Sequence, residues 1–261
     1  MNQIRSLTSR NIRAQVSDAE WEARVNLAAF YRLLARYGMT DLAGTHISAR
    51  VPGTEDQFLI NGYGVYFDEM TASSLYTVDV AGKVLVQPDL HYLVNEAGFT
   101  IHSAIHMARH DIDCVVHTQT RAGMAVSCMK EGLMMLNQTA LRFDGEVAYH
   151  DFEGPAVDHD ERGRLVESLG TKTALILRNH GLLCVGRNIP EAFMNIYALE
   201  QSCKVQVDIM NCRTELHWPS EASRVRSRQV YKGFFNGKPV GETEWEGQLR
   251  WLDRTDPSYR D

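Results

Sequence analysis

Two short apolar segments joined by a four-residue polar turn restrict the fold of this chain most strongly. Residues 173–177 (TALIL) and 182–186 (LLCVG) are separated by the sequence Arg178-Asn179-His180-Gly181. Short apolar runs bounded by turn residues are typical of buried strands. Helical periodicity precedes this pair, and a longer helical pattern follows it over residues 190–211. The pattern predicts a mixed α/β domain.

The N-terminal part of the chain alternates in the same way. Ser17-Asp18-Ala19-Glu20 is a capping box, and the apolar stripe behind it predicts a helix that ends near Gly38. Short strand patterns punctuated by glycines follow over residues 46–86. We predict three parts: an N-terminal arm (1–16), one main domain (17–212) and a helical C-terminal extension (213–261). Trp218, Trp245 and Trp251 of the extension are predicted to anchor an interface or a lid, so truncation at residue 212 is expected to leave a folded, inactive protein.

Composition and charge exclude several classes of protein. The net charge of -6 argues against nucleic-acid binding, which depends on a basic excess. No apolar run of about 18 residues predicts a membrane span, and the first residues show no secretory signal. The 5 cysteines are scattered and form no Cys-x-x-Cys pair, which favours a reducing, cytoplasmic environment.

The sequence contains ten histidines, so we first consider whether their imidazole side chains form a functional site. His117 closes the apolar segment Cys114–His117, and His180 lies in the turn described above. Strand ends and tight turns are where a rigid scaffold presents functional groups, and two neutral imidazoles suit zinc or iron. The alternative is a pair of satisfied histidines at the edge of the core. His102 and His106 are spaced i, i+4, and for this pair we favour buried polar residues over metal chelation.

Four ordered segments give the chain its resemblance to a known family. They are Gly44-Thr45-His46-Ile47-Ser48-Ala49-Arg50, Ala97-Gly98-Phe99-Thr100-Ile101-His102, Val115-Val116-His117-Thr118-Gln119 and Leu177-Arg178-Asn179-His180-Gly181. In this order and spacing, over residues 20–212, the chain resembles the class II aldolase/adducin family, and its adducin-like bacterial branch in particular. The resemblance implies a three-layer α/β/α sandwich with a mostly antiparallel central sheet. It also implies a homotetramer with a small-molecule substrate.

The resemblance further implies a divalent metal held by three histidines. His117 matches the first ligand and His180 the third, whereas Gln119 stands where the middle histidine is expected. Zinc is the first expectation for the metal, with iron or manganese as alternatives, and the amide of Gln119 suits harder cations better. We also expect His46 and Tyr63 to contact the substrate.

Other parts of the family pattern are replaced. The position of the family's catalytic glutamate falls on Gly98, but an alignment shifted by two residues places Glu96 there, and Glu96 is therefore the candidate proton shuttle. Glu96-Ala97 replaces the Ser-Ser pair that binds phosphate in the family, and Thr45-His46 replaces its Gly-Asn turn. These changes favour a substrate without a phosphate group.

Three functions follow as hypotheses. The first is a metal-dependent, aldolase-like lyase that acts on a small carbonyl compound through an enediolate. The second is a non-haem iron oxygenase on the same fold, for which Glu96 or Asp144 would supply the carboxylate ligand. The third is a non-catalytic, adducin-like assembly or binding module. Metal analysis joined to a structure distinguishes the three.

Overall fold

One eight-stranded sheet organises the computed structural model, which describes residues 12–90, 92–154, 161–235 and 240–261. The strand order is β4-β3-β2-β1-β5-β8-β7-β6, and every pairing is antiparallel except that of β6 with β7. The strands are β1 (His46–Arg50), β2 (Gln57–Ile60), β3 (Tyr76–Asp79), β4 (Val84–Val86), β5 (Cys114–Thr118), β6 (Val147–His150), β7 (Ala174–Leu177) and β8 (Gly181–Gly186).

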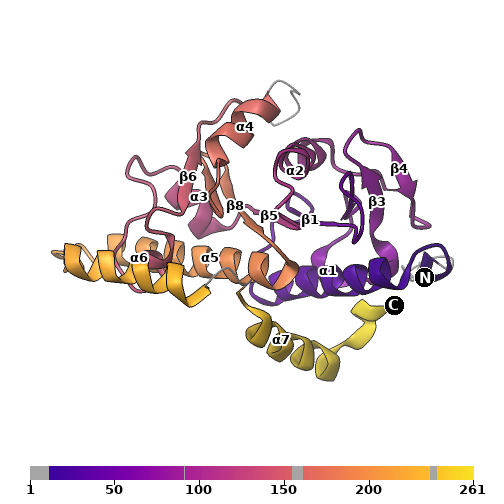
Figure 1. Ribbon diagram of the computed structural model, residues 1–261. Helices are drawn as coiled ribbons and strands as arrows, with labels where there is room; N and C mark the ends of the chain where they lie inside the picture. Colours follow the sequence, from indigo (N-terminus) through magenta and orange to yellow (C-terminus); the bar gives the residue numbers. More distant parts are fainter. Residues whose placement is uncertain (1–11, 91, 155–160, 236–239) are drawn as a thin grey trace, which may run out of the picture.

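Seven α-helices in the described ranges surround this sheet. They are α1 (Asp18–Arg36), α2 (Glu96–Ala108), α3 (Arg121–Ser127), α4 (Glu161–Leu169), α5 (Ile189–Asn211), α6 (Glu221–Phe235) and α7 (Glu242–Thr255). Figure 1 shows α1 and α5 on one side of the sheet, with α2 and α4 on the other. The predicted three-layer α/β/α sandwich with a mostly antiparallel sheet is therefore confirmed.

The alternation of side chains along β5 shows how the two faces differ. Cys114 and Val116 pack into the larger apolar core, which α1 and α5 cover. Val115 points the other way, into the smaller core beneath α2 and α4. Successive residues of a strand point to opposite faces, so His117 lies on the same face as Val115. This face, covered by α2, carries the candidate site.

Local capping fixes where the long helices begin. The Ser17 hydroxyl accepts a hydrogen bond from the Glu20 N–H at 3.1 Å, as the capping box predicts. The Asn95 side chain accepts from the first N–H groups of α2, and Asn188 does the same at α5. The Asn95 cap fixes the start of α2, which packs against β1. In the described ranges, no helix is long and apolar enough to cross a membrane.

The C-terminal extension forms the two predicted helices, but its role differs from the prediction. Trp245 of α7 is only 4% exposed and packs edge-on against Phe30 of α1 and Phe193 of α5. Leu252 and Tyr259 belong to the same core. The proposed lid is therefore wrong for α7, because its apolar side chains complete the core beneath α1 and α5. Truncation at residue 212 would expose that core instead of leaving an intact fold.

Two sequence predictions fall partly or wholly outside the described residues. The N-terminal arm is described only from a short 3-10 helix, Ile12–Ala14, onward. The sequence Asp158-His159-Asp160-Glu161 also predicts a helix cap, and of these residues the described ranges include only Glu161, where α4 begins. Trp218 of the extension is 51% exposed, which agrees with a surface position and assigns it no partner.

Candidate functional site

The register of two neighbouring strands brings the first two histidines together. β1 and β5 run antiparallel, and His46 pairs with His117 across the ladder. Directly paired residues point to the same face of a sheet, and both rings lie beneath α2, with their centroids 4.9 Å apart. The sequence did not predict that His46 would lie beside His117.

The hairpin between β7 and β8 supplies the third imidazole. Asn179 adopts a left-handed conformation (φ 57°), which asparagine tolerates better than most residues. At Gly181, a Cβ atom would lie 2.4 Å from the Thr118 carbonyl oxygen, so only glycine lets the start of β8 approach the end of β5 this closely. The His180 ring then lies with its centroid 4.7 Å from that of His117. The predicted convergence of these two imidazoles is confirmed.

The hydrogen bond of His117 fixes its tautomer. Its Nδ1 lies 3.0 Å from the Leu182 carbonyl oxygen, which can only accept, so Nδ1 carries the hydrogen. Burial and the neighbouring imidazoles lower the pKa of His117 well below its ordinary value of 6.5, so the ring is neutral. Its Nε2 therefore presents a lone pair, and this buried atom has no hydrogen-bond partner among the described residues. A histidine that donates from one nitrogen to a carbonyl and leaves the other bare has the arrangement of a metal ligand.

His180 and Gln119 form the outer side of the site. The His180 ring is partly exposed, and burial lowers its pKa. Its Nε2 lies 2.7 Å from the amide nitrogen of Gln119. An amide NH₂ group only donates, so Nε2 of His180 accepts in this contact and carries no hydrogen. The described residues contain no group of three His, Cys, Asp or Glu side chains arranged to hold a metal. The donors that fit a divalent cation here are therefore the bare nitrogens of His117 and His180, joined by the oxygen of Gln119 after a half-turn of its amide.

The packing of His46 restricts position 98 to glycine. A Cβ atom on Gly98 would lie 2.6 Å from Cδ2 and 2.9 Å from Nε2 of His46. The His46 ring therefore occupies the space into which a side chain at position 98 would project. The two replacements, glycine at 98 and histidine at 46, depend on each other sterically.

Behind His46 lies a hydrogen-bonded chain of buried side chains. His46 Nδ1 is 2.7 Å from His102 Nε2, and His102 Nδ1 is 2.5 Å from the Ser48 hydroxyl. That hydroxyl is also 2.7 Å from Nε2 of His106. Burial lowers the pKa of His46 and of His102 well below 6.5, and it lowers that of His106 to about 3. The three imidazole rings of this hydrogen-bonded chain are therefore neutral.

Part of this hydrogen-bonded chain was predictable from the sequence. The i, i+4 spacing of His102 and His106 predicted that they share a helix face, and both are fully buried, as favoured. Their partners on β1 were not predicted. The sequence feature that could have predicted them is the spacing of His46 and Ser48, which are two residues apart on one strand and therefore lie on the same face of the sheet.

Glu96 and Tyr63 lie differently from the histidines. Glu96 is exposed and lines a separate cavity beside Tyr76 and Phe99. On a helix, residues two apart point to nearly opposite sides, so Glu96 points away from the face on which Gly98 meets His46. Tyr63 is 55% exposed, in the loop after β2. No contact of either side chain with the histidines is present in the described ranges, and both roles stay predictions.

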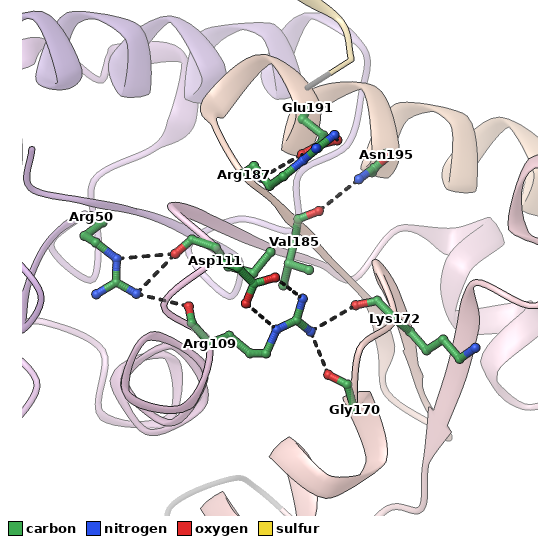
Figure 2. A network of polar contacts seen from close by, with 10 residues as sticks. Arg50, Arg109, Asp111, Gly170, Lys172, Val185, Arg187, Glu191 and Asn195 are labelled. Carbon is green, nitrogen blue, oxygen red and sulfur yellow. Dashed lines mark hydrogen bonds and ion pairs between the residues drawn. The ribbon is translucent and has the colours of Figure 1, made fainter. Parts of the chain in front are cut away.

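A cavity of about 300 Å³ lies at the opposite end of the sheet. Its lining includes Val185 and Gly186, at the far end of β8 from His180, together with Asp144. Figure 2 shows ion pairs and backbone contacts at this end, such as Arg187 with Glu191. Asp144 pairs with Arg224 and Arg228 of α6. This cavity is separate from the histidines, and Asp144 does not reach them.

Comparison with known proteins agrees with this architecture. The family model described as "Class II Aldolase and Adducin N-terminal domain" matches residues 25–207. A Pseudomonas aeruginosa protein assigned to the class 2 aldolases is 47% identical over 263 residues, covering 100% of both chains. Rat alpha-adducin is 41% identical over 252 residues, which cover 91% of this chain but 34% of the adducin.

Solved structures extend the similarity to three dimensions. An aldolase II superfamily protein from Pseudomonas syringae superposes with a TM-score of 0.91 at 44% identity, covering 97% of this chain and 100% of the other. An L-fuculose 1-phosphate aldolase from Glaciozyma antarctica gives a TM-score of 0.79 at 27% identity, covering 93% of each chain.

Proposed function

Because the chain belongs to the class II aldolase and adducin family, we propose that it is a metal-dependent lyase acting on a small, non-phosphorylated carbonyl compound. The observation that carries the proposal is the bare, buried Nε2 of His117 beside the ring of His180. A buried nitrogen without a partner is costly unless a ligand satisfies it. Nδ1 of His106 is unpartnered as well, but His117 differs because its ring lies beside the partly exposed ring of His180, with which it would share a ligand.

The ligand set indicates what the site would do. His117, His180 and the amide oxygen of Gln119 would hold the cation. When bound, a divalent metal would polarise the substrate carbonyl and stabilise negative charge on its oxygen as a carbon–carbon bond breaks. Burial keeps both imidazoles neutral, so they need not lose a proton before they bind the cation.

The residues around the histidines support a substrate without phosphate. Thr45-His46 stands in place of the Gly-Asn turn that the family resemblance assigns to phosphate binding, and here Thr45 is buried and Nδ1 of His46 is already hydrogen-bonded to His102. Glu96 stands in place of the first serine of the other phosphate-binding segment, and its charge would repel a phosphate. Small hydroxycarbonyl compounds are the substrate class that remains.

The two alternatives differ in what supports them. The oxygenase requires a carboxylate ligand, but Asp144 is bound to arginines at the other end of the sheet and Glu96 faces a separate cavity. The similarity to alpha-adducin supports a non-catalytic assembly module, and absence of metal binding would favour it. A homotetramer remains part of the proposal, and light scattering of the purified protein tests it.

Metal analysis tests the proposed site directly. We expect about one divalent ion per chain after gentle purification or after titration with zinc, iron or manganese. His117→Ala and His180→Ala should each abolish that binding, whereas His110→Ala, which changes an exposed histidine outside the site, should retain it.

Loaded protein is then assayed for cleavage of small hydroxycarbonyl compounds. Activity that follows metal content across these three variants supports the lyase. Iron with oxygen consumption supports the oxygenase. Wild-type protein that binds none of these metals at all refutes the proposal.

A further inference from the structure

We propose that Ser48, His102 and His106 act as positioning residues that fix His46 in the tautomer with hydrogen on Nε2, so that His46 donates a hydrogen bond to the substrate oxygen. The inference rests on the proposed function, because it assigns a role at the same site. His46 of β1 would thus provide a neutral donor beside position 98 of α2, where the family resemblance implies an acidic side chain.

Two arrangements of hydrogen bonds satisfy every contact, because the Ser48 hydroxyl must donate its hydrogen to one of the two rings that it contacts. With every ring neutral, each imidazole carries one hydrogen, and the Ser48 hydroxyl carries one. If His46 donates from Nδ1 to His102, then His102 donates to Ser48, and Ser48 donates to His106. If the direction is reversed, His106 donates to Ser48, Ser48 to His102, and His102 to Nδ1 of His46. The first arrangement leaves His46 Nε2 bare, and the second leaves hydrogen on it.

The buried end of the chain decides between the two. Nδ1 of His106 is buried and has no partner among the described residues. In the first arrangement this atom would be an N–H group without an acceptor. In the second it is only an acceptor without a donor. Unpaired buried N–H groups are rarer in proteins than unpaired acceptors, so the second arrangement is favoured.

Other contacts keep this end neutral and fixed. The His106 ring stacks on Phe58 with centroids 4.8 Å apart. The Arg50 guanidinium donates to the His106 carbonyl oxygen at 2.9 Å, and its charge opposes a second positive charge on the ring. His106 therefore cannot readily accept a second proton, which would be needed to reverse the direction of the hydrogen bonds.

At the other end, the His46 ring lies beside the ring of His117. Its Nδ1 is occupied by His102, and its Nε2 lies on the edge of the ring that faces Gly98. The same ring lies between His102 and His117, with centroids 4.7 and 4.9 Å away. An N–H group there would bind an oxygen of the substrate, such as a carbonyl, a hydroxyl or a carboxylate. Ammonium groups, which only donate, would be excluded.

Nitrogen NMR of the imidazole rings tests the proposal without substrate or metal. In metal-free, full-length protein labelled with ¹⁵N in histidine, the bare and hydrogen-bearing nitrogens of a neutral ring resonate far apart. We expect hydrogen on Nε2 of His46, His102 and His106, and on Nδ1 of His117. Hydrogen on Nδ1 of His46 would overturn the proposal, and single His→Gln variants assign the signals.

Two serine variants test whether the chain sets the tautomer. Ser48→Ala should change His46 and His102 from one tautomer to a mixture, and Ser48→Thr, which keeps the hydroxyl, should restore it. Ser103→Ala removes another buried hydroxyl, which bonds only the Thr100 carbonyl of its own helix, and should change neither ring.

A His46 signal unchanged in Ser48→Ala, in protein whose circular dichroism matches wild type, would refute the positioning role. The metal-binding assay fails or succeeds independently of these signals. The two proposals can therefore be refuted separately.

Discussion

Gly98→Ala is the substitution that most directly tests the packing of His46 against α2. The added Cβ would lie 2.6 Å from Cδ2 of His46, which is shorter than any normal carbon–carbon contact. The ring cannot easily move, because Nδ1 is bonded to His102 and the opposite face meets His117. Overpacking of this kind costs about 1–3 kcal/mol, while alanine in place of glycine in a helix gains about 0.5–1 kcal/mol. We expect a net loss of up to about 2.5 kcal/mol.

Gly163→Ala provides the matched control. Gly163 is the third residue of α4, as Gly98 is of α2, and its added Cβ would meet no atom within 4 Å. This variant should be about 0.5–1 kcal/mol more stable than wild type. Urea unfolding followed by circular dichroism gives both free energies, and His46→Ala in the Gly98→Ala background should remove the penalty. If both alanine variants were equally stabilised, the space assigned to the His46 ring would be wrong.

Three further results are expected. Trp245→Ala should lower the free energy of unfolding by about 3–5 kcal/mol in urea titrations, whereas Trp218→Ala, at a half-exposed site, should change it by less than about 0.5 kcal/mol. Gly181→Ala should abolish metal binding measured by calorimetry, because its Cβ would collide with the Thr118 carbonyl and displace the hairpin. Stability of the metal-free protein should fall as the pH drops below about 6.5, by up to about 1.4 kcal/mol per pH unit for each buried imidazole, because the unfolded chain takes up protons that the folded rings exclude. A flat pH profile between 7 and 5 would contradict the buried, neutral rings.

Much of the fold could be predicted because its signals are local. The capping box at Ser17 and the apolar runs on either side of His180 gave the first helix and the β7–β8 hairpin. The convergence of His117 and His180 was also predictable, because a strand end and a turn recur at the spacing of the family. These features depend on a few consecutive residues.

The rest of the site depends on register and on volume, which one sequence does not reveal. His46 meets His117 only because β1 and β5 pair in one particular register. Glycine at position 98 gave no sign in the sequence that a ring from β1 fills the space beside it. The packing of Trp245 was missed for a similar reason, because an aromatic stripe does not show which surface it covers.

The strands that carry the candidate site, β1, β5 and β8, lie next to one another in the middle of the sheet, with three strands on one side and two on the other. The outer strands β4, β3 and β6 carry none of the site's imidazoles and pair with none of these three strands, whereas β7 holds one end of the turn that carries His180. Changes in the length of the outer strands are therefore expected to leave the imidazoles in place. In a sheet arranged this way, the outer strands are free to differ between proteins, while the central strands keep the positions of the site residues. Proteins with very different edges could share one reactive centre.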